Sequence, residues 1–145
     1  MKVKYQDLKE KVKCDLEARY GLNNQLHFLY ESSIDLPPEI LDREGSSGIR
    51  FFSIDGNHTE KYVLNDLTIA ERILVNGGII AVDDYFDSYS PGVSVGVTRF
   101  FIENNNNRLA ILISGGNKLF ITTKEDHLMY RLLIKKFTDV ENVKG

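Results

Sequence analysis

The chain has 145 residues, of which 42% are hydrophobic and 27% charged, and its formal net charge is −3 at pH 7. This length can bury a core within a single domain over residues 1–145, and the acidic balance gives no basic field for nucleic acid or anionic lipid. Cys14 is the single cysteine, which excludes an internal disulfide and fits a reducing cytoplasm. No signal segment opens the sequence and no apolar run is long enough to span a bilayer, so we expect a cytoplasmic protein.

The first third of the chain predicts a helix, a strand and a second helix. Apolar residues recur at spacings of three and four over residues 4–20, and Gly21 is placed to end that helix. Residues 26–30 (LHFLY) predict a short strand. Ser33 or Asp35 can then cap a following helix.

Residues 50–84 are the most informative stretch, because they predict a strand, a helix and a second strand. Residues 50–54 (RFFSI) predict a buried strand. Residues 79–82 (IIAV) form a continuous apolar run, typical of a strand that is covered on both faces. Residues 59–75 carry an apolar stripe at helical spacing, with Thr59 as the candidate cap. A β-α-β unit of this kind brings the ends of two parallel strands to one edge of a sheet, where open α/β sheets bind ligands.

The last third predicts a helix, a hairpin and a closing helix. In chain order we expect a loop over 85–92, a helix over 93–103, strands over 109–114 and 118–123, and a helix over 125–137. Gly115 and Gly116 mark the tight turn of an antiparallel hairpin. The expected fold class is therefore α/β, with a Rossmann-like, mainly parallel sheet of about five strands, helices on both faces and an antiparallel C-terminal strand.

Polar residues follow the first central strand directly, in the sequence Asp55-Gly56-Asn57-His58. Gly56 permits a sharp turn, so the side chains of Asp55 and His58 can point over the strand end. A carboxylate there can bind a hard cation or a ligand hydroxyl, and a histidine can move a proton near neutral pH. The alternative is a turn in which Asp55 and Asn57 only cap the next helix.

Two adjacent carboxylates, Asp83 and Asp84, follow the second central strand. Their repulsion is costly unless a divalent cation or a donor-rich ligand offsets it. The alternative is that one points into the cleft and the other caps a loop. Because Asp55 ends the neighbouring strand, we expect three carboxylates to converge, and oxygen ligands of this kind suit magnesium.

Two further groups of residues have open roles. Tyr85, Phe86 and Tyr89 follow the paired aspartates and can either line the pocket of an organic substrate or pack under the loop. Asn117 and Lys118 are interpreted as structural residues at the tip of the hairpin.

Together these segments resemble the class I S-adenosylmethionine-dependent methyltransferases. The resemblance is to a branch with an IDGDH-type turn, a helix, GG, a strand and a DD-plus-aromatic loop. It runs from Leu26 to Phe137 and includes SIDGNHTEKYVLNDLTIAERILVNGG, IIAVDDYF, SPGVSVGVTRFF and GGNKLFITT. It implies methyl transfer from S-adenosylmethionine to an oxygen of a small-molecule acceptor, without nucleic acid or a membrane as partner.

The resemblance also implies a magnesium ion. In relatives of the metal-dependent O-methyltransferase type, residues at the positions of Asp55, Asp83 and Asp84 hold the ion, which binds the acceptor hydroxyl and lowers its pKa. It further implies Asp55 and His58 as catalytic residues, with His58 or a nearby carboxylate as the candidate base.

For the methyl donor, the resemblance implies three cofactor-binding residues. Glu31 and Ser32 match an acidic-Ser pair that touches the adenine end of the cofactor, and Asp55 is the third.

The sequence departs from the family pattern in its first part. No glycine-rich turn follows a strand before Leu26, so we expect a domain truncated at its N-terminus, and Asn57 replaces the second aspartate of the IDGDH turn. The strand over 50–54 would then be an open edge. Either the strand over 26–30 pairs with it in parallel, which we favour, or a second chain covers it as a homodimer.

The sequence leaves two alternative functions open. One is a non-catalytic remnant or partner subunit with the same fold, which the missing glycine-rich turn favours. The other is a metal-dependent hydrolase of flavodoxin-like build using Asp55, Asp83 and Asp84. The chain shows none of the aspartyl-nucleophile context of such hydrolases, so we rank this last.

Overall fold

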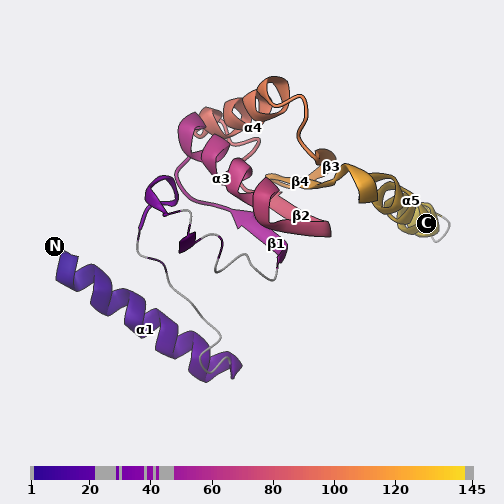
Figure 1. Cartoon of the computed structure of the whole chain (residues 1–145). Coiled ribbons are helices and arrows are strands. Elements are labelled where there is room, and N and C mark those ends of the chain that lie inside the picture. Colours follow the sequence, from indigo (N-terminus) through magenta and orange to yellow (C-terminus); the bar gives the residue numbers. More distant parts are fainter. Residues whose placement is uncertain are drawn as a thin grey trace. The chain divides into compact units, whose positions relative to one another are not determined.

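The computed structural model describes residues 2–21, 29, 31–37, 39–40, 42 and 48–142 (Figure 1). It divides into two compact units, Met1–Glu31 and Ser32–Gly145. A single domain over the whole chain stays a prediction.

The first unit contains helix α1 (Lys2–Tyr20), as the periodicity over 4–20 predicted. Gly21 follows it in the left-handed region, with φ of +66°, a conformation that ends helices and that glycine adopts without strain. The strand predicted over 26–30 lies outside the described residues, apart from Leu29, so its pairing with the next strand stays a prediction.

The second unit contains eight elements in the described part of the chain. They are η1 (Ser33–Asp35), β1 (Ile49–Ile54), α3 (Glu60–Ile73), β2 (Leu74–Val82), α4 (Pro91–Glu103), β3 (Leu109–Gly115), β4 (Lys118–Thr123) and α5 (Lys124–Asn142). Ser33 and Asp35 thus lie inside a short 3-10 turn rather than at a helix cap, and residues 39–40 and 42 are helical.

The described strands form one sheet in the order β1-β2-β4-β3. β1 and β2 are parallel, whereas β2–β4 and β3–β4 are antiparallel. The α/β class, the hairpin and the antiparallel C-terminal strand are confirmed. The sheet is mixed and has four described strands: β1, β2 and β3 run in one direction and β4 runs in the other. The second strand of the hairpin, not its first, lies beside β2, so β4 runs antiparallel to both of its neighbours.

β2 begins at Leu74, well before the predicted start at Ile79. The register between β1 and β2 shifts across this segment, and Gly77 has φ of +73°. A Cβ at Gly78 would lie 2.7 Å from the Leu74 side chain and 2.9 Å from the backbone oxygen of Val75, so a larger residue here would force the backbone to shift. The glycines therefore form an irregularity inside the strand and not its boundary.

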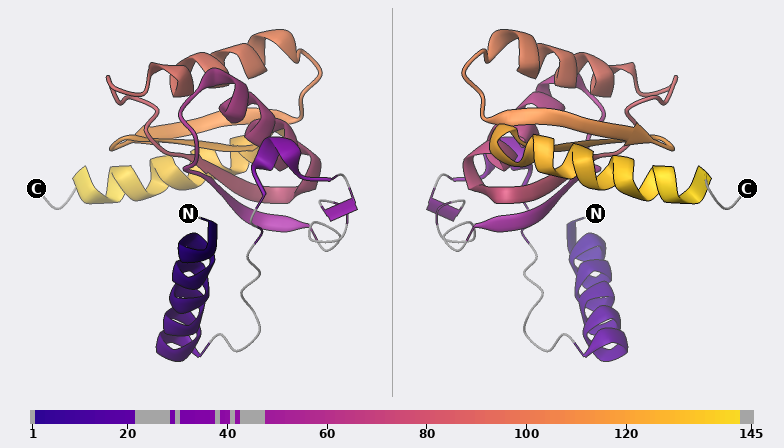
Figure 2. Two further views of the ribbon diagram at one scale, coloured as in Figure 1. Left: turned by 90° about the vertical axis from the view of Figure 1, so that its left-hand side faces the viewer. Right: turned by 90° about the vertical axis from the view of Figure 1, so that its right-hand side faces the viewer.

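Helices α3 and α4 cover one face of the sheet (Figure 2). The core between them and the strands includes Leu67 of α3, Ile80 of β2 and Val97 of α4, each with 0% of its surface exposed. Alternate residues of β1, β2 and β4 face this core, as expected from the two-residue period of a strand: Phe52 and Ile54, Ile80 and Val82, and Leu119 and Ile121.

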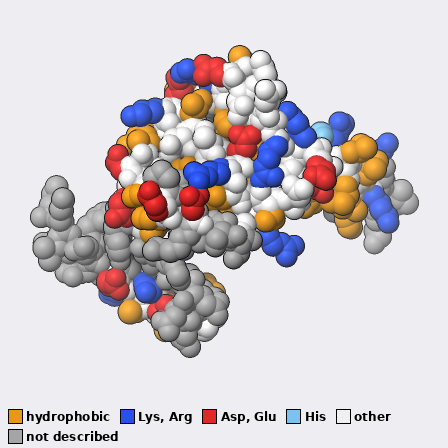
Figure 3. All heavy atoms as spheres, viewed as in Figure 1, with side chains coloured by type: hydrophobic (Ala, Val, Ile, Leu, Met, Phe, Trp, Pro, Cys, Tyr) orange, Lys and Arg blue, Asp and Glu red, His pale blue; other side chains and the backbone are white. Residues whose placement is uncertain are grey.

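Helix α5 contacts β2, β3 and β4 and lies on the other side of the sheet (Figure 2). Thr123 Oγ1 donates to Asp126 Oδ2 at 2.8 Å in its first turn, and Tyr130 donates through its hydroxyl to Gly77 O at 2.6 Å. Its C-terminal part extends beyond the sheet, and hydrophobic side chains gather over it (Figure 3). No helix in the described ranges combines the length and the apolar character needed to cross a membrane.

Candidate active site

The site lies where the two parallel strands end. β1 ends at Ile54 and β2 at Val82, and the backbone N–H of Asp83 donates to Ile54 O at 2.9 Å, so the pairing continues one residue past β2. Asp55 and the Asp83-Asp84 pair therefore leave the sheet at the same edge.

Asp55, His58 and Asp84 form a cluster at this edge. Each offers one nitrogen or oxygen atom, and these atoms all lie within 4.8 Å of one another. His58 Nε2 lies 3.1 Å from Asp84 Oδ2. Asp55 and His58 are exposed and Asp84 is half-buried, so the cluster is open to water and to ligands.

Asp83 is not part of this cluster, although we expected it there. One carboxylate oxygen pairs with Lys118 Nζ, and the other accepts the backbone N–H of Asp84 at 3.0 Å. The hydrogen bond from Lys118, followed by that from Asp84, keeps the pKa of Asp83 below its ordinary value. The repulsion between adjacent carboxylates is thus offset by a lysine, and only Asp84 faces Asp55.

Asn117 holds the loop that carries Asp84. Its Nδ2 donates to Asp84 Oδ1 at 2.7 Å, its Oδ1 accepts from Phe86 N at 3.1 Å, and its carbonyl accepts from Tyr85 N at 3.0 Å. Asp84 itself has φ of +54°, an uncommon conformation for a residue other than glycine. Asn117 and Lys118, interpreted from the sequence as hairpin structure, therefore position the two aspartates. No local signal pointed to this, since they lie more than thirty residues away.

The imidazole of His58 is oriented by a buried serine. His58 Nδ1 lies 2.8 Å from Ser90 Oγ, and Ser90 Oγ donates to Asp87 Oδ2 at 2.9 Å. Ser90 is 5% exposed. Because the hydroxyl has one proton and gives it to Asp87, Nδ1 must donate to the serine oxygen. Nε2 is then the ring nitrogen that faces Asp84.

Asn57 caps the helix that follows the turn. The alternative interpretation of the sequence gave this role to Asp55 and Asn57 together. Its Oδ1 accepts from the backbone N–H of Thr59 at 3.0 Å, and Thr59 makes no side-chain cap of its own. The turn before α3 is therefore closed by the amide.

A hollow of about 460 Å³ lies next to Asp55. Its lining residues are Ser32, Ser33, Phe52, Ser53, Asp55, Gly56, Asn57, Tyr62 and Asp66. This volume is in the range of small-molecule pockets, roughly 300–1,000 Å³. The hydroxyl oxygen of Ser32 is buried and has no hydrogen-bond partner among the described residues. Glu31, the other predicted adenine contact, belongs to the first unit and is not placed relative to this hollow.

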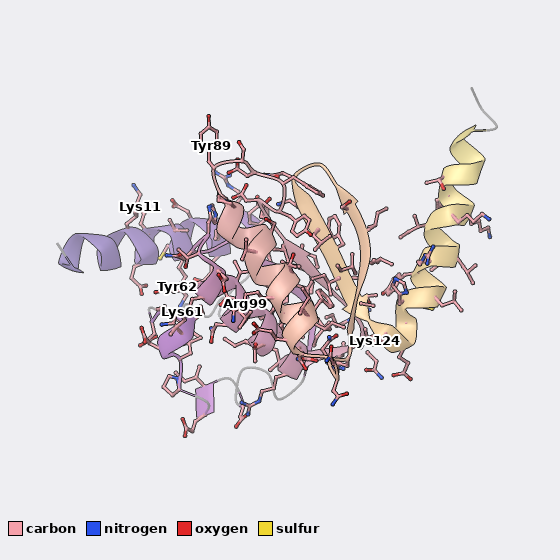
Figure 4. All side chains as sticks on the ribbon, turned by 90° about the horizontal axis from the view of Figure 1, so that it is seen from above. Lys11, Lys61, Tyr62, Tyr89, Arg99 and Lys124 are labelled. Atoms are coloured by element: carbon pink, nitrogen blue, oxygen red, sulfur yellow. The ribbon has the colours of Figure 1, made fainter. Side chains whose placement is uncertain are left out.

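The aromatic residues of the loop divide into two kinds. Tyr85 packs against the core and meets Phe86 edge-on, with ring centroids 4.7 Å apart. Phe86 is 60% exposed and Tyr89 94% exposed, and Tyr89 points outward from the loop before α4 (Figure 4). One ring thus packs under the loop, and two remain open to solvent near the cluster.

Comparison with known proteins identifies the family. A family described as a methyltransferase domain matches residues 5–85, more than half of the chain, so the chain belongs to this family. No curated protein sequence matches the chain. A solved structure that resembles it is the apo form of a TDP-rhamnose 3'-O-methyltransferase, an enzyme in calicheamicin biosynthesis. That match has 16% identity and a TM-score of 0.48, and covers 63% of this chain and 38% of that one.

Proposed function

We propose that this chain takes part in methyl transfer from S-adenosylmethionine to a hydroxyl oxygen of a small molecule. The observation that carries the proposal is the convergence of Asp55, His58 and Asp84 at the ends of two parallel strands, beside a hollow that Asp55 also lines. Membership of the methyltransferase-domain family supports the class of reaction.

The side chains around the hollow fit part of the methyl donor. Ser32 offers a buried hydroxyl that no side chain or backbone group of the described ranges satisfies, which suits the adenine end. Phe52 and Tyr62 offer flat apolar surfaces, and Asp55 and Asp66 can accept hydrogen bonds from ligand hydroxyl or ammonium groups. When bound, the donor supplies an electrophilic methyl group on a positively charged sulfur. Glu31 remains the proposed second contact to the adenine.

The cluster itself fits a divalent cation, and we assign magnesium to it. Asp55 and Asp84 are the proposed ligands, because their carboxylates lie close together and magnesium prefers oxygen. Such an ion supplies Lewis-acid polarisation of the acceptor hydroxyl. Asp83 is assigned to the loop instead, since Lys118 already pairs with it.

His58 is the proposed base. Ser90 and Asp87 fix its ring so that Nε2 faces the cluster, where it can accept the proton of an acceptor hydroxyl. The 3.1 Å contact with Asp84 Oδ2 places a negative charge beside the imidazolium that results.

Calorimetric titration of the full chain with S-adenosylhomocysteine tests the donor site. We expect saturable binding that Ser32→Ala weakens by about tenfold, because the buried hydroxyl loses its hydrogen bond to the ligand. A conservative change outside the hollow, Glu103→Gln at the end of α4, is expected to leave the binding unchanged.

An absence of binding at millimolar ligand would instead favour the second candidate function, a non-catalytic remnant or partner subunit with the same fold. The specific observation in its favour is Asn57, an uncharged residue where the family turn has its second aspartate. The acidic cluster could persist in such a protein without catalysis.

Titration with Mg²⁺ or Mn²⁺ tests the cation site. Asp84→Asn should weaken binding by about tenfold or more, because one of two anionic ligands is lost. Asp83→Asn is the matched control, adjacent in the chain but turned towards Lys118, and should have little effect. Equal losses in the two variants would contradict the assignment and bring Asp83 back into the site.

A further inference from the structure

Helix α5 leaves a row of large apolar side chains open to water. The exposed fractions are 67% for Leu128, 48% for Met129, 61% for Leu132, 44% for Leu133 and 70% for Phe137. Contiguous apolar surface of this kind marks an interaction site more often than it occurs by chance on a monomer.

This apolar row is bounded by opposite charges. One shallow hollow along the helix, here called the α5 face, is lined by Glu125, Leu128, Met129, Leu132, Leu133 and Lys136. Glu125 lies at its N-terminal end and Lys136 at its C-terminal end, with only apolar residues between them. The face is therefore acidic at one end, basic at the other and hydrophobic in the middle.

We propose that the α5 face binds the same face of a second copy of this chain, with the two helices antiparallel about a two-fold axis. Glu125 then lies opposite Lys136 of the second copy, and Leu128 lies opposite Leu133. Met129 and Leu132 meet next to the axis. Each of these contacts occurs twice, because a two-fold interface is made of the same patch on both subunits.

The positions of the two charges on the α5 face favour an antiparallel second copy of the chain as the partner. An antiparallel copy brings opposite charges together at both ends, whereas a parallel copy would place like charges opposite each other. Along this face, Glu125, Met129, Leu132 and Lys136 follow one another at spacings of four, three and four residues. This is the spacing of the residues at the contact between two packed helices. A lipid surface is disfavoured, because Glu125 would meet anionic headgroups at the edge of the face.

The acidic end of the face is held in place within the chain. Asn76 Nδ2 donates to Glu125 Oε2 at 2.5 Å, which fixes the carboxylate at the first turn of α5. A carboxylate has lone pairs for further donors, so this bond leaves room for the lysine of the second copy. No residue of the α5 face belongs to the candidate active site, so the pairing can be tested independently of the proposed methyl transfer.

Sedimentation velocity of the full chain over about a hundredfold range of concentration is the first test. We expect a concentration-dependent dimer, and Leu132→Gln should weaken it by about tenfold or more, since symmetry removes two leucine contacts at once. Ile102→Gln is the matched control, the same kind of change at a residue that is 67% exposed on α4. A monomer at every concentration, or equal effects of both variants, would overturn the proposal.

Charge reversal tests the antiparallel order of the two helices. Glu125→Lys and Lys136→Glu should each weaken the dimer by about tenfold, because each places like charges opposite one another at both ends. The double variant restores the opposite charges and should recover most of the affinity. Circular dichroism confirms that all three variants stay helical. A double variant as weak as the weaker single variant would overturn the antiparallel arrangement.

Discussion

On one face of the sheet, Leu67 of α3 and Val97 of α4 have 0% of their surface exposed, whereas on α5, on the other side, Leu132 and Phe137 are 61% and 70% exposed. All three helices carry an apolar stripe in the sequence. The stripes of α3 and α4 are used inside the unit, and much of the stripe of α5 is not. Hydrophobic periodicity therefore predicts which side of a helix is apolar, but not whether the same chain covers that side.

The largest effect is expected when a buried side chain is removed from the covered face of the sheet. Leu67→Ala removes a fully buried side chain from the core between α3 and the sheet. We expect a loss of about 2–5 kcal/mol in the free energy of unfolding, from lost burial and from the cavity that remains. Urea denaturation measures it, and a loss below about 1 kcal/mol would mean that this core is not tightly packed.

A second change tests how closely α3 and α4 approach. A Cβ at Gly96 would lie 2.8 Å from Val63 Cβ and 3.0 Å from Glu60 O, so Gly96→Ala must push the two helices apart. We expect a destabilisation of about 1–3 kcal/mol in thermal or urea unfolding. Gly115→Ala is the control, because a Cβ there meets nothing within 4 Å. Similar losses in both variants would point to helix and strand propensity instead of the close contact.

A third prediction concerns the end of the sheet, where Lys118 lowers the pKa of Asp83. A carboxyl group whose folded pKa is depressed adds stability above its unfolded pKa, and this stability is lost as the pH falls through the folded pKa. The chain should therefore lose part of its stability on acidification below about pH 4, and Lys118→Met should reduce that loss. Melting temperatures across this range measure it. Asp83→Asn should have the same effect, and adding Lys118→Met to it should change little more.

The smallest effect is expected on the uncovered side. Leu128→Gln changes an apolar side chain that is 67% exposed, and glutamine forms helices about as well as leucine. At a concentration where the chain is monomeric, the free energy of unfolding should change by less than about 0.5 kcal/mol. A loss as large as that of Leu67→Ala would show that α5 is covered by other residues of its own chain.

Much of the fold was predictable because its signals are local. The stripe of α3 and the glycines between β3 and β4 predicted those elements, and the structure confirms them. The start of β2 was missed, because Gly77 and Gly78 look like a boundary and are instead an irregularity within the strand. The order of the hairpin strands, with β4 rather than β3 beside β2, depends on long-range packing and leaves no local pattern.

Part of the candidate site was also predictable from the sequence. Consecutive parallel strands end at one edge, which is why Asp55 and Asp84 could be expected to meet. The separate position of Asp83 could not be foreseen, because it depends on Lys118 from a strand that pairs with β2 on its other side. The link from His58 through Ser90 to Asp87 was likewise hidden, since it depends on how the loop before α4 closes.

The hydrogen bonds between Asn117 and residues 84–86 have a consequence for folding during synthesis. During synthesis, Asp55, His58 and Asp84 leave the ribosome well before the hairpin that immobilises their loop. A nascent chain that stops short of residue 117 therefore holds every group of the acidic cluster but lacks the amide that fixes its geometry. The geometry of the acidic cluster is thus completed late, when the final strands pair.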